Sequence, residues 1–276
     1  MIMKVAICAL AKNENAYIDE WVRYHIDLGY DRIYLFDNND PETPFVGDFI
    51  SPDYRDKVEI QAVQGDYRTR QFVVYNQWIK EHTGEYDWCT FIDIDEFVVT
   101  SKNSIKDLLA TMPDDCRYMI LTWQMFGDDD IVEGDESRPV RERITQRQGT
   151  ADDLWNRMIK TTVRCNDATI RARHSHSFRR VANGEVEQPI CHNCYGVPMR
   201  ISRDGMTAGF GWHTDHYIAH YSTKTIAEFL KYKVRQIGRV WLNSPSRYFW
   251  RFNKKTPEKL AYIEQYKAQH GIDINL

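Results

Sequence analysis

Apolar runs of strand length alternate with amphipathic segments along the first hundred residues. The runs that predict buried strands are residues 4–10, 31–36, 58–63 and 88–99. Residues 17–28 carry apolar side chains at helical spacing and stop at Gly29, and residues 70–80 show a second helical pattern. This β-α-β-β-α-β order predicts an α/β fold on a doubly wound, mostly parallel sheet. A further strand is expected at residues 118–126.

Two aspartates interrupt the apolar run at residues 91–99, which reads Phe-Ile-Asp-Ile-Asp-Glu-Phe-Val-Val. If the run is one strand, Asp93 and Asp95 project to the same face. Two ionised carboxylates so placed repel unless a cation or a long basic side chain lies between them. A solvated acidic turn is the alternative, but the apolar flanks make solvation difficult. The pattern therefore favours a divalent-metal or phosphate-metal site.

Polar clusters follow three of the predicted strands: residues 12–14 (Lys-Asn-Glu), residues 37–39 (Asp-Asn-Asn), and the acidic pair. In open parallel sheets, ligands bind beyond the carboxyl ends of the strands, so the clusters should converge on one crevice. Each cluster alone is also typical of a capped turn. The chain has no Gly-x-Gly-x-x-Gly fingerprint and no phosphate-binding Gly-Lys-Ser/Thr. We therefore expect a nucleotide site whose diphosphate is neutralised by a metal.

Composition narrows the class of partner. The 276 residues are 42% hydrophobic and 28% charged with a net charge of −4, which disfavours a nucleic-acid partner. Neither a signal-peptide pattern nor an apolar run of membrane-spanning length is apparent, so a cytoplasmic protein is expected. Residues 247–255 mix basic and aromatic side chains. Such a segment suits peripheral contact with an anionic membrane surface, although a packed terminal helix is the favoured interpretation.

Six cysteines are present, of which Cys191 and Cys194 have Cys-x-x-Cys spacing. That spacing allows a zinc or redox site. A zinc site needs a second ligand pair, and His174 with His176 offers poor spacing for it. Ordinary reduced thiols are therefore the expected state.

Specific motifs along the chain resemble GT-A glycosyltransferases of the family-2-like and family-92-like type. The motifs are Ala11-Lys-Asn-Glu14, Glu20-Trp21, His25, residues 29–38, Arg70-Gln71, Tyr75-Asn76, Trp88, residues 91–97, Trp123, Phe126-Gly127, residues 141–145, residues 160–163 and residues 220–229. The resemblance runs from residue 4 to about residue 235, and the stretch 181–215 has no counterpart in it. It implies a Rossmann-like GT-A domain over 1–235 with a nucleotide-sugar half (1–100) and an acceptor half (101–235). A helical C-terminal extension would occupy 236–276.

The resemblance implies metal-dependent transfer of a sugar from a UDP-sugar to a hydroxyl of a glycan or lipid-linked saccharide, with inversion, in surface polysaccharide synthesis. Mn²⁺ (or Mg²⁺) would be the cofactor, with Asp95 as direct ligand, Asp93 acting through water or on the donor, and His220 as a candidate third ligand. Glu14 and Asp37 would hold the uracil and ribose. Arg70 or Arg68 would meet the diphosphate. The other donor-binding residues implied are Leu10, Lys12, Asn13, Asn38 and Gln71.

The general base has two candidates. Inversion requires one carboxylate near the acceptor hydroxyl. Asp129 follows the strand expected at 118–126, and Asp215 precedes the His-Tyr element at residue 220. Asp129 is slightly favoured of the two. Two other functions remain open: a non-catalytic nucleotide-sugar or carbohydrate-binding protein, and a sugar-nucleotide nucleotidyltransferase. The latter is expected to carry a glycine-rich loop after the first strand, which residues 11–15 lack.

Overall fold

The computed structural model describes residues 2–150, 153–187, 190–202, 205–207, 215–234, 245–271, 274 and 276, without the side chains of residues 68 and 245–247. The chain divides into two compact units. The first comprises residues 1–123 and 151–219, and the second comprises residues 124–150 and 220–276. Each unit combines two separate stretches of the sequence. Their limits differ from residues 100 and 235, at which the resemblance divides the chain.

A mixed sheet forms the centre of the first unit. Its strands, in spatial order, are β13 (Pro198–Met199), β12 (Cys191–Asn193), β6 (Tyr118–Phe126), β8 (Ile159–Arg164), β4 (Trp88–Phe91), β1 (Val5–Ala11), β2 (Arg32–Asp37) and β3 (Val58–Ala62). The portion β4-β1-β2-β3 is parallel throughout, and β12 is parallel to β6. Strand β8 runs antiparallel to both of its neighbours, β4 and β6. The predicted α/β class with a mostly parallel sheet is thus confirmed.

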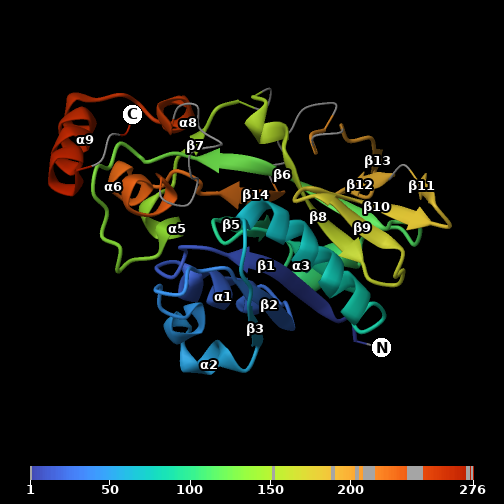
Figure 1. The fold of residues 1–276 in the computed structure, drawn as a ribbon. Coiled ribbons are helices and arrows are strands. Elements are labelled where there is room, and N and C mark those ends of the chain that lie inside the picture. The colour runs from blue at the N-terminus through green and yellow to red at the C-terminus, as the bar shows by residue number, and fades with distance from the viewer. Residues whose placement is uncertain are drawn as a thin grey trace. The chain divides into compact units, whose positions relative to one another are not determined.

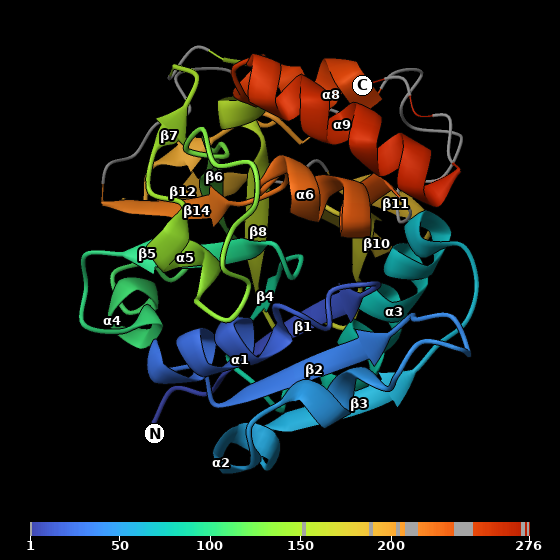
Figure 2. The same cartoon turned by 90° about the vertical axis from the view of Figure 1, so that its left-hand side faces the viewer.

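Helices cover both faces of the parallel strands. Every residue of β1 is buried, as a central strand covered on two sides requires. Alternate β1 side chains, including Cys8 and Leu10, pack with Val74 and Trp78 of α3 (Tyr67–His82). Helix α1 (Ile18–Asp27) lies on the opposite side of β1 (Figures 1 and 2). Both helices lie where the sequence pattern predicts them.

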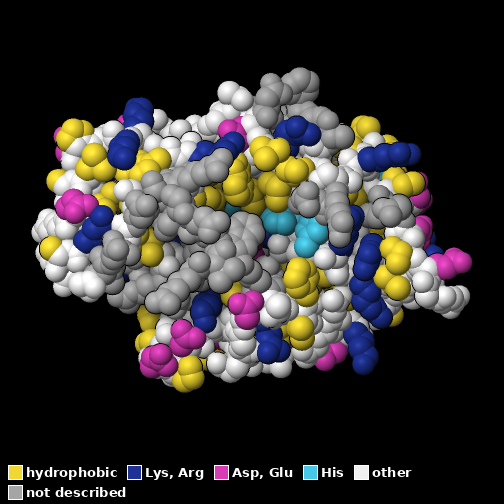
Figure 3. All heavy atoms as spheres, turned by 45° about the horizontal axis from the view of Figure 1, so that its top comes forward, with side chains coloured by type: hydrophobic (Ala, Val, Ile, Leu, Met, Phe, Trp, Pro, Cys, Tyr) yellow, Lys and Arg dark blue, Asp and Glu magenta, His cyan; other side chains and the backbone are white. Residues whose placement is uncertain are grey.

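A small antiparallel sheet also belongs to the first unit. It consists of β9 (Ile170–His174), β10 (Ser177–Ala182) and β11 (Glu185–Glu187), in the order β11-β10-β9. Its first two strands are rich in arginine. Lys and Arg side chains gather on the right of Figure 3, the side where Figure 1 places these strands. The remaining elements of the unit are η1 (Val46–Phe49), α2 (Pro52–Arg55), β5 (Glu96–Thr100), α4 (Ile105–Leu109), η2 (Trp155–Arg157) and β14 (His216–His220).

The predicted strand at 88–99 is wrong in one respect, because it is two strands separated by a turn. Strand β4 ends at Phe91 and β5 begins at Glu96. The Glu96 carboxylate accepts a hydrogen bond from the Asp93 backbone N–H (2.9 Å), and the Glu96 N–H donates to the Asp93 carbonyl (3.1 Å). These bonds close the chain on itself at residues 92–95. Asp93 and Asp95 therefore lie in a tight turn and not on one face of a strand.

The second unit is mainly helical. Its elements are α5 (Val140–Arg143), β7 (Arg147–Gln148), α6 (Ile226–Glu228), η3 (Phe229–Lys233), α8 (Pro245–Phe252) and α9 (Pro257–His270), together with the last residues of β6. Phe249 of α8 is fully buried and packs with Phe229 and Ile263. The C-terminal helices are thus confirmed, and α8 packs as a terminal helix. None of the helices that the structure describes is both long and apolar enough to cross a membrane.

All six cysteines are buried free thiols. Burial raises the pKa of Cys191 and of Cys194 to about 12. The His174 ring, proposed as a possible zinc ligand with them, bonds the His176 backbone N–H through Nδ1 and the Ser177 hydroxyl through Nε2. Both ring nitrogens of His174 are thus engaged within the first unit.

Candidate active site

The parallel strands bring three polar loops to one edge of the sheet. Ala11 at the end of β1 pairs in register with Asp37 at the end of β2, and Cys8 pairs with Phe91 at the end of β4. The Asn38 N–H continues the ladder by donating to the Ala11 carbonyl (2.8 Å). The loops after β1, β2 and β4 therefore leave the sheet side by side, at the edge where α/β proteins bind ligands.

The loop after β1 is held against the loop after β2. Asn13 has a left-handed backbone (φ 57°), and its N–H donates to the Asn39 side chain (2.7 Å). Lys12 reaches across through its ammonium to the Asn38 carbonyl (3.2 Å) and the Asp40 carboxylate (2.8 Å). These two donor-site candidates thus order the loops on which they stand.

Asp37 has a structural task in the same region. One carboxylate oxygen accepts from the Asn39 N–H (3.0 Å) and the other from the Val46 N–H (3.1 Å). The neighbouring Asn38 donates its side-chain amide to the Gly65 carbonyl (3.2 Å), which ties the loop to the one after β3. Glu14, in contrast, is a buried carboxylate (5% exposed) at the head of α1. Leu10 is a core residue of β1.

The turn after β4 is organised by a buried lysine. Asp93 accepts hydrogen bonds from the Gln71 amide (2.6 Å) and the Lys160 ammonium (2.7 Å). The same ammonium lies 3.2 Å from the Glu96 carboxylate, and the Lys160 side chain is fully buried. A long basic side chain therefore lies between the carboxylates, as the repulsion between them requires. We missed the role of Lys160, although a lysine inside the β-branched run Ile-Lys-Thr-Thr-Val at residues 159–163 was a usable signal.

Burial and charge perturb the titration of this cluster. Burial raises the pKa of Glu96 to about 8, against the opposing effect of Lys160. The pKa of Lys160 is also raised: burial acts downward, but the attraction of Asp93 and Glu96 outweighs it. The pKa of the Tyr67 hydroxyl is raised well above its ordinary value by burial and then by nearby carboxylates. Those carboxylates are Asp93, Asp95, Glu14 and Glu96. Tyr67 thus marks where the acidic groups of the β1 and β4 loops gather.

Arg70 stands in α3 beside the loop after β3. Gly65 (φ 119°) lies so close to it that an added Cβ would be 2.7 Å from a terminal guanidinium nitrogen. The Arg70 Nε is buried and has no hydrogen-bond partner among the described residues. A guanidinium with unused donor capacity is suited to phosphate oxygens. The side chain of Arg68, the alternative candidate, lies outside the described residues.

The acidic turn has the donor chemistry of a divalent-metal site. Asp95 is 3% exposed, and carboxylate oxygens suit Mg²⁺ and Mn²⁺. Within the part of the chain that the structure describes, no group of three His, Cys, Asp or Glu is placed to hold an ion. Mg²⁺ in nucleotide enzymes is commonly held by one or two carboxylates plus substrate phosphates, so Asp95 with Asp93 fits that mode.

The remaining candidates are divided between the units. The Asp129 carboxylate, in the second unit, accepts from the Thr145 N–H (2.6 Å) and the Gln146 N–H (3.0 Å), and its backbone is left-handed (φ 51°). His220, also in the second unit, ends β14 and is 5% exposed. Asp215, in the first unit, is exposed and accepts from the Ser101 N–H through its carbonyl (2.8 Å). Their catalytic and metal-binding roles stay predictions.

Residues 3–194 of the chain match the model of glycosyltransferase family 92. The chain belongs to this family. A family 92 protein of Ricinus communis is 27% identical over 105 residues, which cover 34% of this chain and 17% of that protein. A family 92 protein of Arabidopsis thaliana is 24% identical over 127 residues, covering 39% and 20%. The family 92 chain described here thus spans only about a fifth of the length of these curated relatives.

Solved glycosyltransferase structures share a weaker similarity with the family 92 chain. A structure of S. aureus TarS, residues 1–349, aligns with 98% of this chain and 74% of its own, at 13% identity and a TM-score of 0.39. The galactosyltransferase LgtC, solved with donor and acceptor sugar analogues, aligns with 58% of each chain at 19% identity and a TM-score of 0.29.

Proposed function

We propose that this family 92 chain transfers a sugar from a UDP-sugar to a hydroxyl of a glycan or lipid-linked saccharide, in a reaction that requires Mn²⁺ or Mg²⁺. The observation that carries the proposal is the acidic cluster around Tyr67, at the carboxyl ends of β1 and β4. Buried carboxylates are costly unless a partner stabilises them. Lys160 balances Asp93 and Glu96, and Asp95 and Glu14 bring further negative charge to the same loops, which suits the binding of a metal ion with its nucleotide.

On the donor side, each loop has a suitable group. Glu14 offers a carboxylate to donor N–H or hydroxyl groups of the nucleoside, and Asp37 holds the loop that would border the ribose. Arg70 offers its guanidinium to the diphosphate, where negative charge develops as the glycosidic bond breaks. Asp95 would hold the metal, assisted by Asp93, and the bound ion would stabilise the leaving diphosphate as a Lewis acid.

The acceptor side calls for one base. We expect inversion at the anomeric carbon, because a single in-line displacement needs only one carboxylate to take the acceptor proton. Asp129 already accepts two backbone hydrogen bonds and shapes the turn before residue 146, which reduces its suitability as a base. Asp215 is exposed, and a carboxylate open to solvent is accessible to a docked hydroxyl, so Asp215 is the base that we favour. A cytoplasmic location, with peripheral contact to a membrane that presents the acceptor, completes the proposal.

The metal assignment is tested by thermal stability. Wild-type protein should gain Tm with UDP and Mn²⁺ together, and a UDP-sugar panel should identify the donor. Asp95→Ala should lose this gain and all transfer, because the diphosphate loses its metal counter-charge. Asp56→Ala, at an exposed carboxylate with a side chain 71% exposed, is the matched control and should behave as wild type. Near-normal turnover with unchanged Mn²⁺ dependence in Asp95→Ala would refute the metal site.

The diphosphate assignment is tested with two glycines. Gly65→Ala places a methyl group 2.7 Å from the Arg70 guanidinium, so it should displace that group and weaken UDP affinity at least several-fold. Arg70→Ala should have the same effect. Gly84→Ala is the control, because Gly84 also has positive φ (85°) but has open space around it. Both variants carry the strain of alanine at positive φ. Equal UDP affinity of the two variants by calorimetry would remove Arg70 from the site.

A further inference from the structure

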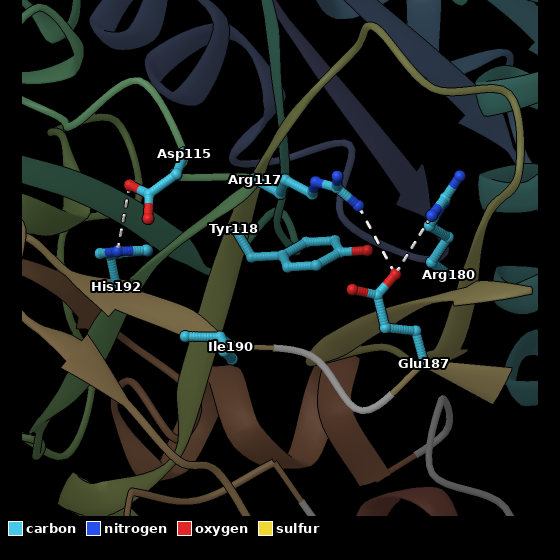
Figure 4. Close-up of a pocket in the computed structure, with 7 residues that line it drawn as sticks. All are labelled: Asp115, Arg117, Tyr118, Arg180, Glu187, Ile190 and His192. Atoms are coloured by element: carbon cyan, nitrogen blue, oxygen red, sulfur yellow. Dashed lines mark hydrogen bonds and ion pairs between the residues drawn. The ribbon is translucent and has the colours of Figure 1, made fainter.

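A pocket on the first unit lies apart from the acidic loops and has no role in the proposed transfer. It has a volume of about 190 Å³ and lies between the end of the main sheet and the small sheet. Seven residues line it: Asp115, Arg117, Tyr118, Arg180, Glu187, Ile190 and His192. Figure 4 shows the Tyr118 hydroxyl pointing toward the side chains of Arg117, Arg180 and Glu187, with His192 on the opposite side of the ring.

Two polar atoms at the floor of this pocket are buried and unpartnered. Tyr118, at the start of β6, and His192, on β12, are each 3% exposed. Neither the Tyr118 hydroxyl nor the His192 Nδ1 has a hydrogen-bond partner among the described residues. Buried polar groups in folded proteins almost always have partners, and an unpaired one costs free energy. Both atoms belong to residues that line one pocket, which points to a polar ligand that supplies their hydrogen bonds.

The charges around the pocket cancel. Arg117 and Arg180 both approach the Glu187 carboxylate, at 3.6 and 3.4 Å. Arg180 also pairs with Asp167 at 2.9 Å, and His192 lies 3.8 Å from Asp115. Each guanidinium therefore already faces a carboxylate. An anionic ligand would meet the Glu187 charge, and a cationic one would meet two guanidinium groups.

We infer that this pocket binds one uncharged saccharide unit through the Tyr118 hydroxyl and the His192 imidazole. Sugar hydroxyls both donate and accept, which matches the mixture of tyrosine, histidine, guanidinium and carboxylate groups. At about 190 Å³ the pocket is smaller than the roughly 300–1,000 Å³ sites of drug-sized ligands, so it suits a single small polar ring. The pocket would be a second saccharide site that holds a glycan outside the reaction centre. This inference rests on the pocket alone and not on the proposed transfer.

Saturation-transfer difference NMR on the full chain tests the inference. The probes are five uncharged methyl glycosides: those of glucose, galactose, mannose, N-acetylglucosamine and rhamnose. At least one should give a signal that Tyr118→Phe, which removes only the hydroxyl, reduces by fivefold or more. Tyr34→Phe is the matched control, because the Tyr34 hydroxyl is bonded to Tyr86 elsewhere on the same sheet (3.1 Å). It should leave the signal unchanged. Circular dichroism checks that each variant is folded.

Two further variants and a second ligand distinguish this inference from the alternatives. Asp95→Ala should keep the Tyr118-dependent signal, so failure of the proposed transfer and failure of the pocket are distinguishable. His192→Asn should weaken the same signal, because its shorter side chain no longer places a polar atom at the pocket floor. No signal with any of the five glycosides, or an equal signal in Tyr118→Phe, overturns the inference. Because arginines are numerous near this site, inorganic phosphate is also titrated. Tyr118-dependent binding of phosphate without glycoside binding would make the pocket an anion site and refute the assignment.

Discussion

Replacing Lys160 with methionine removes the one positive charge that the structure places between Asp93 and Glu96. The ammonium lies 2.7 and 3.2 Å from these carboxylates, and the Lys160 side chain is fully buried. Removing one partner of a buried ion pair costs about 3–5 kcal/mol, because the other charge stays buried without compensation. The Asp93 side chain is 23% exposed and keeps its bond to Gln71, so we expect the lower end, about 3 kcal/mol. This corresponds to a Tm lower by roughly 6–12 °C.

The loss of stability in Lys160→Met should depend on pH, because Glu96 titrates near neutrality. Its pKa is about 8 in the folded protein, above the ordinary value of 4.5. A raised pKa means that the folded state keeps a proton that the unfolded chain releases, so stability falls as pH rises from about 4.5 to about 8. Without Lys160 the pKa of Glu96 rises further, and the fall continues above pH 8. The gap between wild type and Lys160→Met should therefore be wider at pH 9 than at pH 6.

Thermal unfolding in EDTA, followed by circular dichroism at both pH values, measures this gap. Lys254→Met is the control, because Lys254 makes a 2.7 Å ion pair with Asp130 while its side chain is 79% exposed. An exposed pair contributes little, so this variant should stay within about 2 °C of wild type. When both proteins carry Glu96→Gln, the gap between the single variant and the double variant with Lys160→Met should no longer depend on pH. A Lys160→Met variant as stable as the control, or an equal gap at both pH values, would refute the role of the buried ammonium.

Three further predictions concern the nucleotide, the configuration of the product and the base. Glu14→Ala should weaken UDP binding measured by calorimetry. Asp37→Ala should also weaken it, because the N–H groups that its carboxylate binds would no longer fix the loop after β2. Unchanged UDP affinity in both variants would remove the two residues from the site. The product should be β-linked when an α-linked UDP-sugar is the donor, and NMR showing an α-linkage would exclude inversion. Between the two base candidates, the Asp→Asn variant of the true base should lower turnover by roughly a hundredfold or more with donor binding spared. We now expect this at Asp215 and an active enzyme at Asp129→Asn.

Local sequence patterns predicted the regular elements well. The strand expected at residues 118–126 has these bounds in the structure, and the helix expected at 17–28 spans Ile18–Asp27. Residues 118–126 form a nearly continuous apolar run that is buried at every position, and residues 17–28 repeat apolar side chains at helical spacing. The period is set by neighbours along the chain, so it can be read without knowledge of the fold.

The acidic turn could not be predicted in the same way, because its shape depends on distant residues. Lys160, which pairs with Asp93, is 67 residues away from it in the sequence, and Gln71, which donates a hydrogen bond to Asp93, is 22 residues away. An alternation of apolar and acidic residues is equally compatible with a strand. The pocket floor has a similar origin, because Tyr118 and His192 come together only through the pairing of β6 with β12. Such contacts follow from tertiary structure and leave no local period.

The turn also explains why the two aspartates would have different tasks in the proposed reaction. On a strand, Asp93 and Asp95 would be equivalent neighbours on one face. In the turn, Asp93 is neutralised by Lys160 and fixed by Gln71. A carboxylate that already has a cationic partner attracts a second cation less strongly. Asp93 therefore suits the weaker task that the proposed reaction gives it, which is contact with the metal through water or with the donor. The diphosphate would complete the coordination when the donor binds.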